Sequence, residues 1–124
     1  MAKLFLVTGS VFLALAVAFG AFGAHIVQDT LTPERFDVYR TAVSYHFYHA
    51  LGLMIVGLAA LHLPDSSLLT WSGWSLTAGI LVFSGSLYLL TLTDTGWLGA
   101  ITPIGGVAFI LGWLLLAAAV FREL

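Results

Sequence analysis

Four stretches of this chain carry no Asp, Glu, Lys or Arg, and each is long enough to cross a lipid bilayer as a helix. They cover residues 4–24, 42–61, 71–92 and 101–121. An α-helix needs roughly 20 mainly apolar residues to span the hydrocarbon core of a membrane. The sequence therefore predicts a single domain, residues 1–124, with four transmembrane helices at about 4–25, 33–62, 66–92 and 102–121.

The amino-acid composition supports a membrane protein and excludes several other classes. Hydrophobic residues make up 60% of the chain and charged residues 8%, whereas soluble domains have about 25% charged residues. Lipid must therefore cover most of the surface. The net charge of −2 gives no basic patch for nucleic acid. The absence of cysteine excludes disulfides, thiolate metal sites and cysteine catalysis.

Short connections between the four stretches predict how the helices pack. Thr32, Pro33 and Glu34 form a typical helix start, and Thr102-Pro103 repeats part of this signal. Pro64 and Ser66 separate the second helix from the third. Because such short loops join neighbours, we expect an all-α membrane protein whose four helices form an antiparallel up-and-down bundle, with both termini on one side.

Small residues recur at spacings of three and four along the predicted helices. Such residues let the backbones of two membrane helices approach closely. The helix-packing positions predicted in this way are Gly9, Ala16, Gly20, Gly23, Gly79, Gly105 and Gly112.

The second predicted helix carries the most unusual polar residues, His46 and His49. Ionisable groups at membrane depth are candidates for function. Imidazoles at this spacing are able to bind a metal or haem iron or to relay protons, and they are equally able to hydrogen-bond to neighbouring helices. No His-Glu-x-x-His motif or membrane-embedded carboxylate accompanies them, so we predict no catalytic residues and no required cofactor, with haem or metal as the alternative.

Four motifs give the chain a resemblance to a known family. They are GAFGAH (20–25), TAVSYHFYHALGL (41–53), GILVFSGSLYLL (79–90) and ITPIGGVAFILGW (101–113). Together they resemble the domain of unknown function 423 family, which is similar to eukaryotic transmembrane protein 256. The resemblance implies a small multi-pass protein of the bacterial inner membrane. It implies no established activity and no catalytic residues.

The polar residues of these motifs fall toward one side of the membrane when the helices alternate in direction. We therefore predict a one-sided polar cluster that holds a ligand or stabilises the bundle. Its candidate members are His25, Tyr45, His46, His49, Ser84, Ser86, Tyr88 and Thr102.

Three functions remain open at this point. The leading hypothesis is a non-enzymatic structural, stabilising or assembly component whose partners are the lipid bilayer and either further copies of itself or a larger membrane complex. The alternative is binding of a small ligand, haem or metal at the polar cluster. The third is a small transporter or channel formed by an oligomer. Proton-coupled exporters of similar size depend on a membrane-embedded Glu, which no span of this chain contains.

Overall fold

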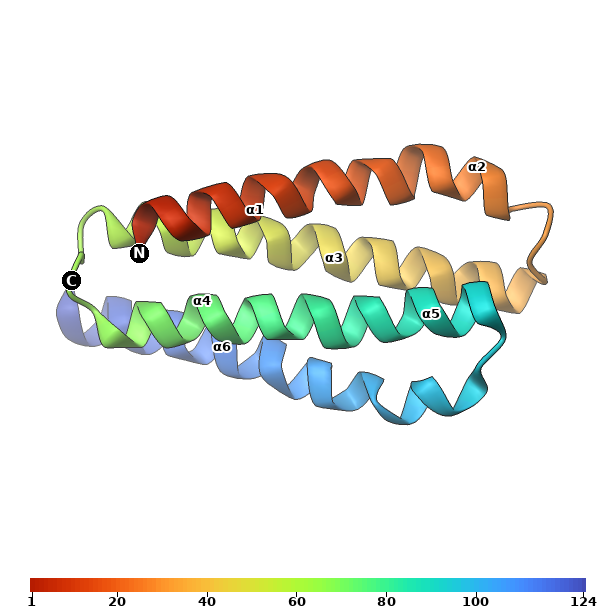
Figure 1. Ribbon diagram of the computed structural model, residues 1–124. Coiled ribbons are helices and arrows are strands. Elements are labelled where there is room, and N and C mark those ends of the chain that lie inside the picture. Colours follow the sequence, from red (N-terminus) through yellow and green to blue (C-terminus); the bar gives the residue numbers. More distant parts are fainter.

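The computed structural model describes residues 1–124, and its long helices form an antiparallel four-helix bundle (Figure 1). Four stretches are long and apolar enough to cross a membrane: Ala2–Val27, Pro33–Ala60, Ser67–Thr93 and Gly96–Glu123. The fold predicted from the sequence is thereby confirmed. The elements are α1 (Ala2–Val17), η1 (Ala18–Gly23), α2 (Ala24–Val27), α3 (Pro33–Ala60), α4 (Ser67–Gly79), η2 (Ile80–Ser84), α5 (Gly85–Thr93), η3 (Gly96–Ala100) and α6 (Thr102–Glu123).

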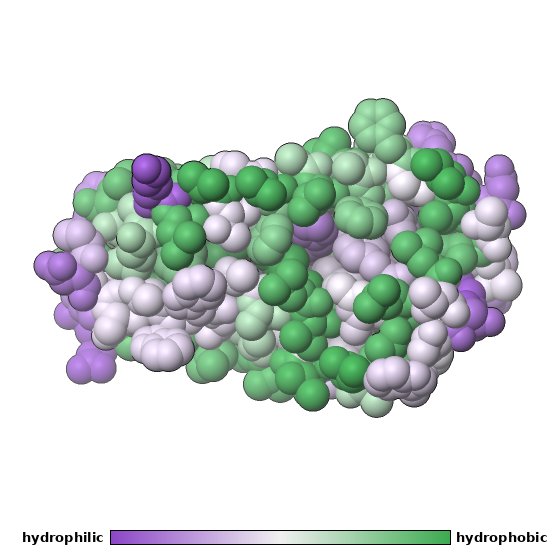
Figure 2. All heavy atoms as spheres, viewed as in Figure 1, coloured by the Kyte–Doolittle hydropathy of each residue, from purple (hydrophilic) through white to green (hydrophobic).

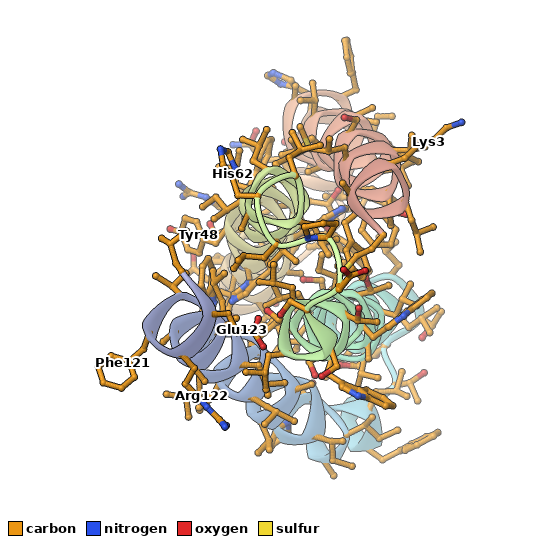
Figure 3. All side chains as sticks on the ribbon, turned by 90° about the vertical axis from the view of Figure 1, so that its left-hand side faces the viewer. Lys3, Tyr48, His62, Phe121, Arg122 and Glu123 are labelled. Atoms are coloured by element: carbon orange, nitrogen blue, oxygen red, sulfur yellow. The ribbon has the colours of Figure 1, made fainter.

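The bundle consists of two tightly packed helical hairpins. One pairs α1 with α3, and the other pairs α4 with α6. The hairpins meet where α3 packs against α4, η2 and α5. Both termini lie at one end, as the up-and-down topology requires (Figure 1). Figure 3 looks along the bundle from this end and shows α1 and α6 as the outer members, with α3 and α4 between them.

The surface of the bundle suits a bilayer. Hydrophilic residues gather at the two ends, and apolar residues cover much of the length between them (Figure 2). At 1.5 Å per residue the 28 residues of α3 extend about 42 Å, which exceeds the roughly 30 Å of a hydrocarbon core. The charged first turns of α3 therefore stand at the membrane boundary or beyond it.

Two of the predicted helix starts are capped by side-chain hydroxyls. The hydroxyl of Thr32 accepts a hydrogen bond from the amide of Arg35 at 3.3 Å, and the hydroxyl of Ser66 accepts one from the amide of Leu69 at 3.1 Å. The start of α6 differs from the prediction. Thr102 lies inside the helix and does not cap it, because the turn of η3 runs into α6 and leaves the Thr102 hydroxyl free for another partner.

Glycines lie where the helices of each hairpin approach most closely. A side chain on Gly9 would meet Ala50, Leu53 and Met54 of α3, and one on Gly112 would meet Leu76 of α4. The remaining predicted packing residues also face a neighbouring helix or lie in the core. Gly20 faces Val43, Gly23 faces Tyr39, Gly79 faces Phe109, Gly105 faces the backbone of Phe83, and Ala16 is fully buried.

Two π-helical turns interrupt the membrane helices, η1 in the first span and η2 in the third. Each contains one more residue per turn than an α-helix, so the side chains that follow are rotated by roughly 100° about the helix axis. Both turns lie against the first half of α3: Gly20 of η1 approaches Val43, and Ser84 of η2 donates a hydrogen bond to the carbonyl of Ala42.

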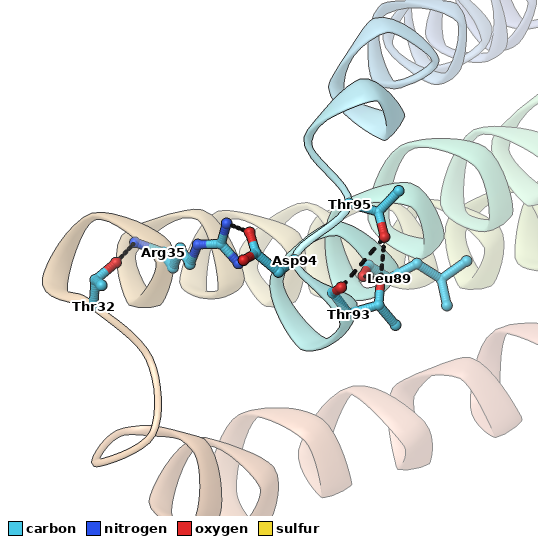
Figure 4. A network of polar contacts seen from close by, with 6 residues as sticks. All are labelled: Thr32, Arg35, Leu89, Thr93, Asp94 and Thr95. Carbon is cyan, nitrogen blue, oxygen red and sulfur yellow. Dashed lines mark hydrogen bonds and ion pairs between the residues drawn. The ribbon is translucent and has the colours of Figure 1, made fainter.

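The end opposite the termini is joined by a polar network between two loops (Figure 4). Arg35 at the start of α3 forms an ion pair with Asp94, which follows α5. Asp94 adopts a left-handed conformation with φ of 56°, a common way to end a helix. Thr93 hydrogen-bonds to Leu89 and to Thr95 beside it. This network connects the two hairpins outside the apolar core.

Candidate functional site

His46 lies on the side of α3 that faces α1 and α5. Its Nδ1 is 2.9 Å from the hydroxyl of Tyr88, and the residue is 4% exposed. Phe12 of α1 contacts the imidazole edge-on, and Phe19 of η1 stacks on Tyr88 with 4.5 Å between ring centroids. The other nitrogen, Nε2, is buried and has no hydrogen-bond partner within the chain. This side of α3 is therefore enclosed by aromatic rings.

Tyr39 completes the enclosed side, although it was not among the predicted site residues. Its hydroxyl donates a hydrogen bond of 2.6 Å to the carbonyl of Phe19, and its ring lies 5.6 Å from that of Tyr88. Tyr39 is 1% exposed. The bond occupies a carbonyl in η1, where the π-helical turn alters the regular hydrogen-bonding pattern.

His49 faces a different neighbour, α6. Its ring stacks on Phe109 with 3.4 Å between centroids, and Trp113 lies beside it at 5.9 Å. Its Nδ1 is 2.7 Å from the carbonyl oxygen of Tyr45. A carbonyl only accepts, so Nδ1 must carry the proton. In the neutral ring, Nε2 then holds a lone pair and acts as an acceptor or metal ligand.

The Nε2 atom of His49 has no partner in the chain and, unlike that of His46, is not sealed from the surroundings. His49 lines a groove of about 440 Å³ between α3, η2 and α6. The other lining residues are mainly aromatic or aliphatic: Tyr45, Phe83, Pro103, Gly106, Val107, Phe109, Ile110 and Trp113. We call this hollow the aromatic groove. Val107 and Ile110 are well exposed, so the groove opens toward lipid.

The serine and threonine candidates connect helices. Ser84 donates a 2.8 Å hydrogen bond to the carbonyl of Ala42 and ties η2 to α3. The hydroxyls of Ser86 and Thr102 lie 2.7 Å apart and tie α5 to the start of α6. Ser86 also bonds to the carbonyl of Phe83, so these hydroxyls are satisfied within the bundle.

The structure does not unite the eight candidate residues in one cluster. His46 and Tyr88 form one pair, Tyr45 and His49 border the aromatic groove, and Ser86 with Thr102 forms a third contact. The two histidines diverge because a step of three residues leaves side chains about 60° apart around a helix, which is enough to direct them to different neighbours.

His25 requires a correction. Its side chain is exposed in the last turn of α2 and forms no hydrogen bond, so it does not join His49. The turn η1 ends two residues before His25, and the extra residue of a π-helical turn rotates the side chains that follow it about the helix axis, which the position of His25 in the sequence does not reveal. No group of three or more His, Asp or Glu side chains lies close enough to hold a metal ion.

Comparison with known proteins shows full-length relatives and one matching family. The sequence model of the family described as "Protein of unknown function (DUF423)" matches residues 19–106, a range that contains all eight polar candidates. The UPF0382 membrane protein YwdK of Bacillus subtilis is 45% identical over 98% of this chain and 99% of its own length. A UPF0382 membrane protein of Staphylococcus epidermidis is 46% identical over 97% of both chains. No solved structure matches.

Proposed function

Because the chain belongs to the DUF423 family, whose description assigns no activity, we propose its function from the aromatic groove. We propose a non-enzymatic protein of the bacterial cytoplasmic membrane that binds a lipid-soluble molecule with a flat ring and a ring hydroxyl, such as a quinol. The observation that carries this proposal is the unpartnered Nε2 acceptor of His49 inside a groove lined by aromatic rings.

The groove determines the kind of molecule that fits. Its volume of about 440 Å³ falls within the range of roughly 300–1,000 Å³ common for small-molecule sites. The exposed residues at its rim are apolar, so a ligand enters from the bilayer. Phe83, Phe109 and Trp113 offer surfaces for a planar ring. His49 Nε2 accepts a hydrogen bond, which favours a hydroxyl over a carbonyl at that point of the ligand.

The cytoplasmic membrane fits two further observations. The relatives come from Bacillus and Staphylococcus and are named membrane proteins. The chain itself spans as helices, whereas proteins of bacterial outer membranes are β-barrels. Service as an assembly component or as a subunit of an oligomer remains a prediction, for which crosslinking in native membranes is the direct measurement.

Binding of decylubiquinol tests the proposal. Isothermal titration calorimetry of the protein in mild detergent compares the quinol with its dimethyl ether, which has the same ring and tail but no donor. We expect the quinol to bind about tenfold tighter, the equivalent of one hydrogen bond of about 1.4 kcal/mol. His49→Phe keeps a ring on Phe109 and removes the acceptor, so it should lower quinol affinity to that of the ether.

His25→Phe is the matched control, because this histidine is exposed and outside the groove. It should bind the quinol as the wild type does. Equal affinity for quinol and ether, or no binding of either, contradicts the proposal. An absorption spectrum of the purified protein distinguishes a quinol from haem in the groove. A Soret band that is lost in His49→Phe would identify haem as the ligand instead.

A further inference from the structure

A second hollow lies on the α1–α3 hairpin, between η1, α2 and α3. Its volume is about 150 Å³, and it is lined by Gly20, Ala24, Phe36, Tyr39, Arg40, Val43 and Ser44. The small residues Gly20 and Ala24 leave space on one side, and the rings of Phe36 and Tyr39 close the other. Because the Tyr39 hydroxyl already donates a hydrogen bond to the Phe19 carbonyl, the free polar groups of the hollow belong to Arg40 and Ser44.

Arg40 and Ser44 have no partners within the chain. The ion pair at this end of the bundle uses Arg35, and no carboxylate pairs with Arg40. Ser44 differs in this respect from Thr41 and Thr77, whose side chains donate to the carbonyl four residues earlier. Arg40 and Ser44 are one turn apart and lie on the same face of α3. Together they present a cation and a hydroxyl to the hollow.

The position of Arg40 along α3 places this pair at the membrane boundary. The charged residues of α3 all fall between Glu34 and Arg40, and the remaining two thirds of the helix has none. The roughly 12 Å by which α3 exceeds the hydrocarbon core is therefore at this end. Arg40 lies about 10 Å along the helix from Pro33, at the level where lipid phosphates lie.

We propose that this hollow binds the phosphate group of a zwitterionic phospholipid such as phosphatidylethanolamine. The guanidinium of Arg40 and the hydroxyl of Ser44 donate hydrogen bonds to the phosphate oxygens, a geometry for which the planar fork of arginine is suited. The ammonium of the headgroup faces Asp37, which is exposed one turn earlier on α3. The lipid chains lie along the apolar side of the hollow formed by Gly20 and Val43.

The surrounding charges favour a zwitterionic headgroup over an anionic one. Glu34 and Asp37 precede Arg40 within two turns, and Arg35 is engaged with Asp94. These carboxylates repel a headgroup with net negative charge, because such a headgroup has no ammonium to balance its phosphate. The lipid source is favoured over free phosphate because five of the seven lining residues are apolar, aromatic or glycine and the hollow lies at the membrane boundary.

Native mass spectrometry of the delipidated protein tests this site. Phosphatidylethanolamine and phosphatidylglycerol of identical chain length are added at equal concentration. We expect the ethanolamine lipid to bind more tightly, and we expect Arg40→Gln to lower its affinity about tenfold. Ala24→Leu fills the hollow without changing any charge and should lower the affinity to a similar degree.

Arg122→Gln is the matched control, since it removes one arginine at the opposite end of the bundle and should leave the affinity unchanged (Figure 3). An equal loss in Arg40→Gln and Arg122→Gln would show general attraction of lipid to interfacial arginines and overturn the proposal. Tighter binding of phosphatidylglycerol would overturn it as well. Displacement of the lipid by inorganic phosphate would assign the hollow to a free anion and would also overturn it.

Discussion

The two histidines of α3 lie three residues apart and experience opposite surroundings. His46 is enclosed between α1, α3 and α5, with Tyr88 on one nitrogen and no partner on the other. His49 borders the aromatic groove, with its Nδ1 bonded to the preceding turn of its own helix. His46 therefore depends on a different helix for its hydrogen bond, whereas His49 bonds to a carbonyl of its own helix.

This difference separates a role in packing from a role in binding. Removing the partner of a buried polar group leaves it unsatisfied, at a cost of about 1–3 kcal/mol. A substitution at His46 or Tyr88 incurs this cost, because each residue is the hydrogen-bond partner of the other. The carbonyl that His49 uses already belongs to the helix and loses nothing essential when the imidazole is absent. Stability should therefore respond to changes at His46, and ligand affinity to changes at His49.

The largest effect is expected from His46→Ala. The change opens a cavity between α1 and α3 and leaves the Tyr88 hydroxyl without its acceptor or donor. We expect a loss of about 2–4 kcal/mol in the free energy of unfolding, measured by steric trapping in bicelles. His25→Ala, at an exposed position, should change it by less than about 0.5 kcal/mol. Similar values for the two variants would show that His46 is not enclosed as described.

Tyr88→Phe should have the next largest effect. It retains the ring that stacks on Phe19 and removes the only hydrogen-bond partner of His46. We expect a loss of about 1–2 kcal/mol, since the imidazole is then buried with neither nitrogen bonded. Tyr45→Phe is the matched control, because the Tyr45 hydroxyl makes no hydrogen bond in the bundle and its ring contacts Phe83. If both variants unfold alike, the hydrogen bond between His46 and Tyr88 contributes nothing.

The four membrane spans could be predicted from the sequence. The different surroundings of His46 and His49 could not. Charge-free windows predict transmembrane helices because a charge is costly wherever a helix crosses the hydrocarbon core. Small-residue spacing similarly pointed to Gly9 and Gly112, since close backbone approach depends on residue size alone. The charge-free windows and the small-residue spacing are both local features of the sequence, so they can be recognised without knowledge of the tertiary structure.

The neighbours that each polar residue meets depend on rotation about the helix axis. The sequence predicts one polar cluster that includes His46 and His49, but α3 packs against all three other membrane spans, so the two side chains meet different neighbours. The π-helical turns η1 and η2 add rotations that no sequence motif predicted, and η1 ends two residues before His25, whose position was predicted wrongly. The aromatic groove was missed for the same reason, because Phe83, Phe109 and Trp113 read as ordinary apolar residues.

Ser84→Ala tests how much the contact of η2 with α3 contributes. The variant removes the hydrogen bond from the Ser84 hydroxyl to the carbonyl of Ala42, a buried contact between two spans. Interhelical hydrogen bonds in membranes average about 0.6 kcal/mol, so we expect a loss of about 0.5–1 kcal/mol. Ser44→Ala removes a hydroxyl with no bond in the chain and should be neutral within about 0.3 kcal/mol. A larger loss from Ser44→Ala than from Ser84→Ala would contradict the assigned contacts.

The smallest effect on stability is expected from His49→Phe, and it sharpens the comparison most. A phenyl ring occupies a similar volume and can stack on Phe109 as the imidazole does. The lost hydrogen bond leaves the Tyr45 carbonyl with its helical amide partner, so no buried group becomes unsatisfied. The free energy of unfolding should change by less than about 0.5 kcal/mol in the same steric-trapping measurement. His46→Phe, tested alongside, deprives Tyr88 of its partner and should cost about 1 kcal/mol or more. Reversal of this order would place the structural histidine on the groove side of α3 and leave the enclosed side as the candidate for binding.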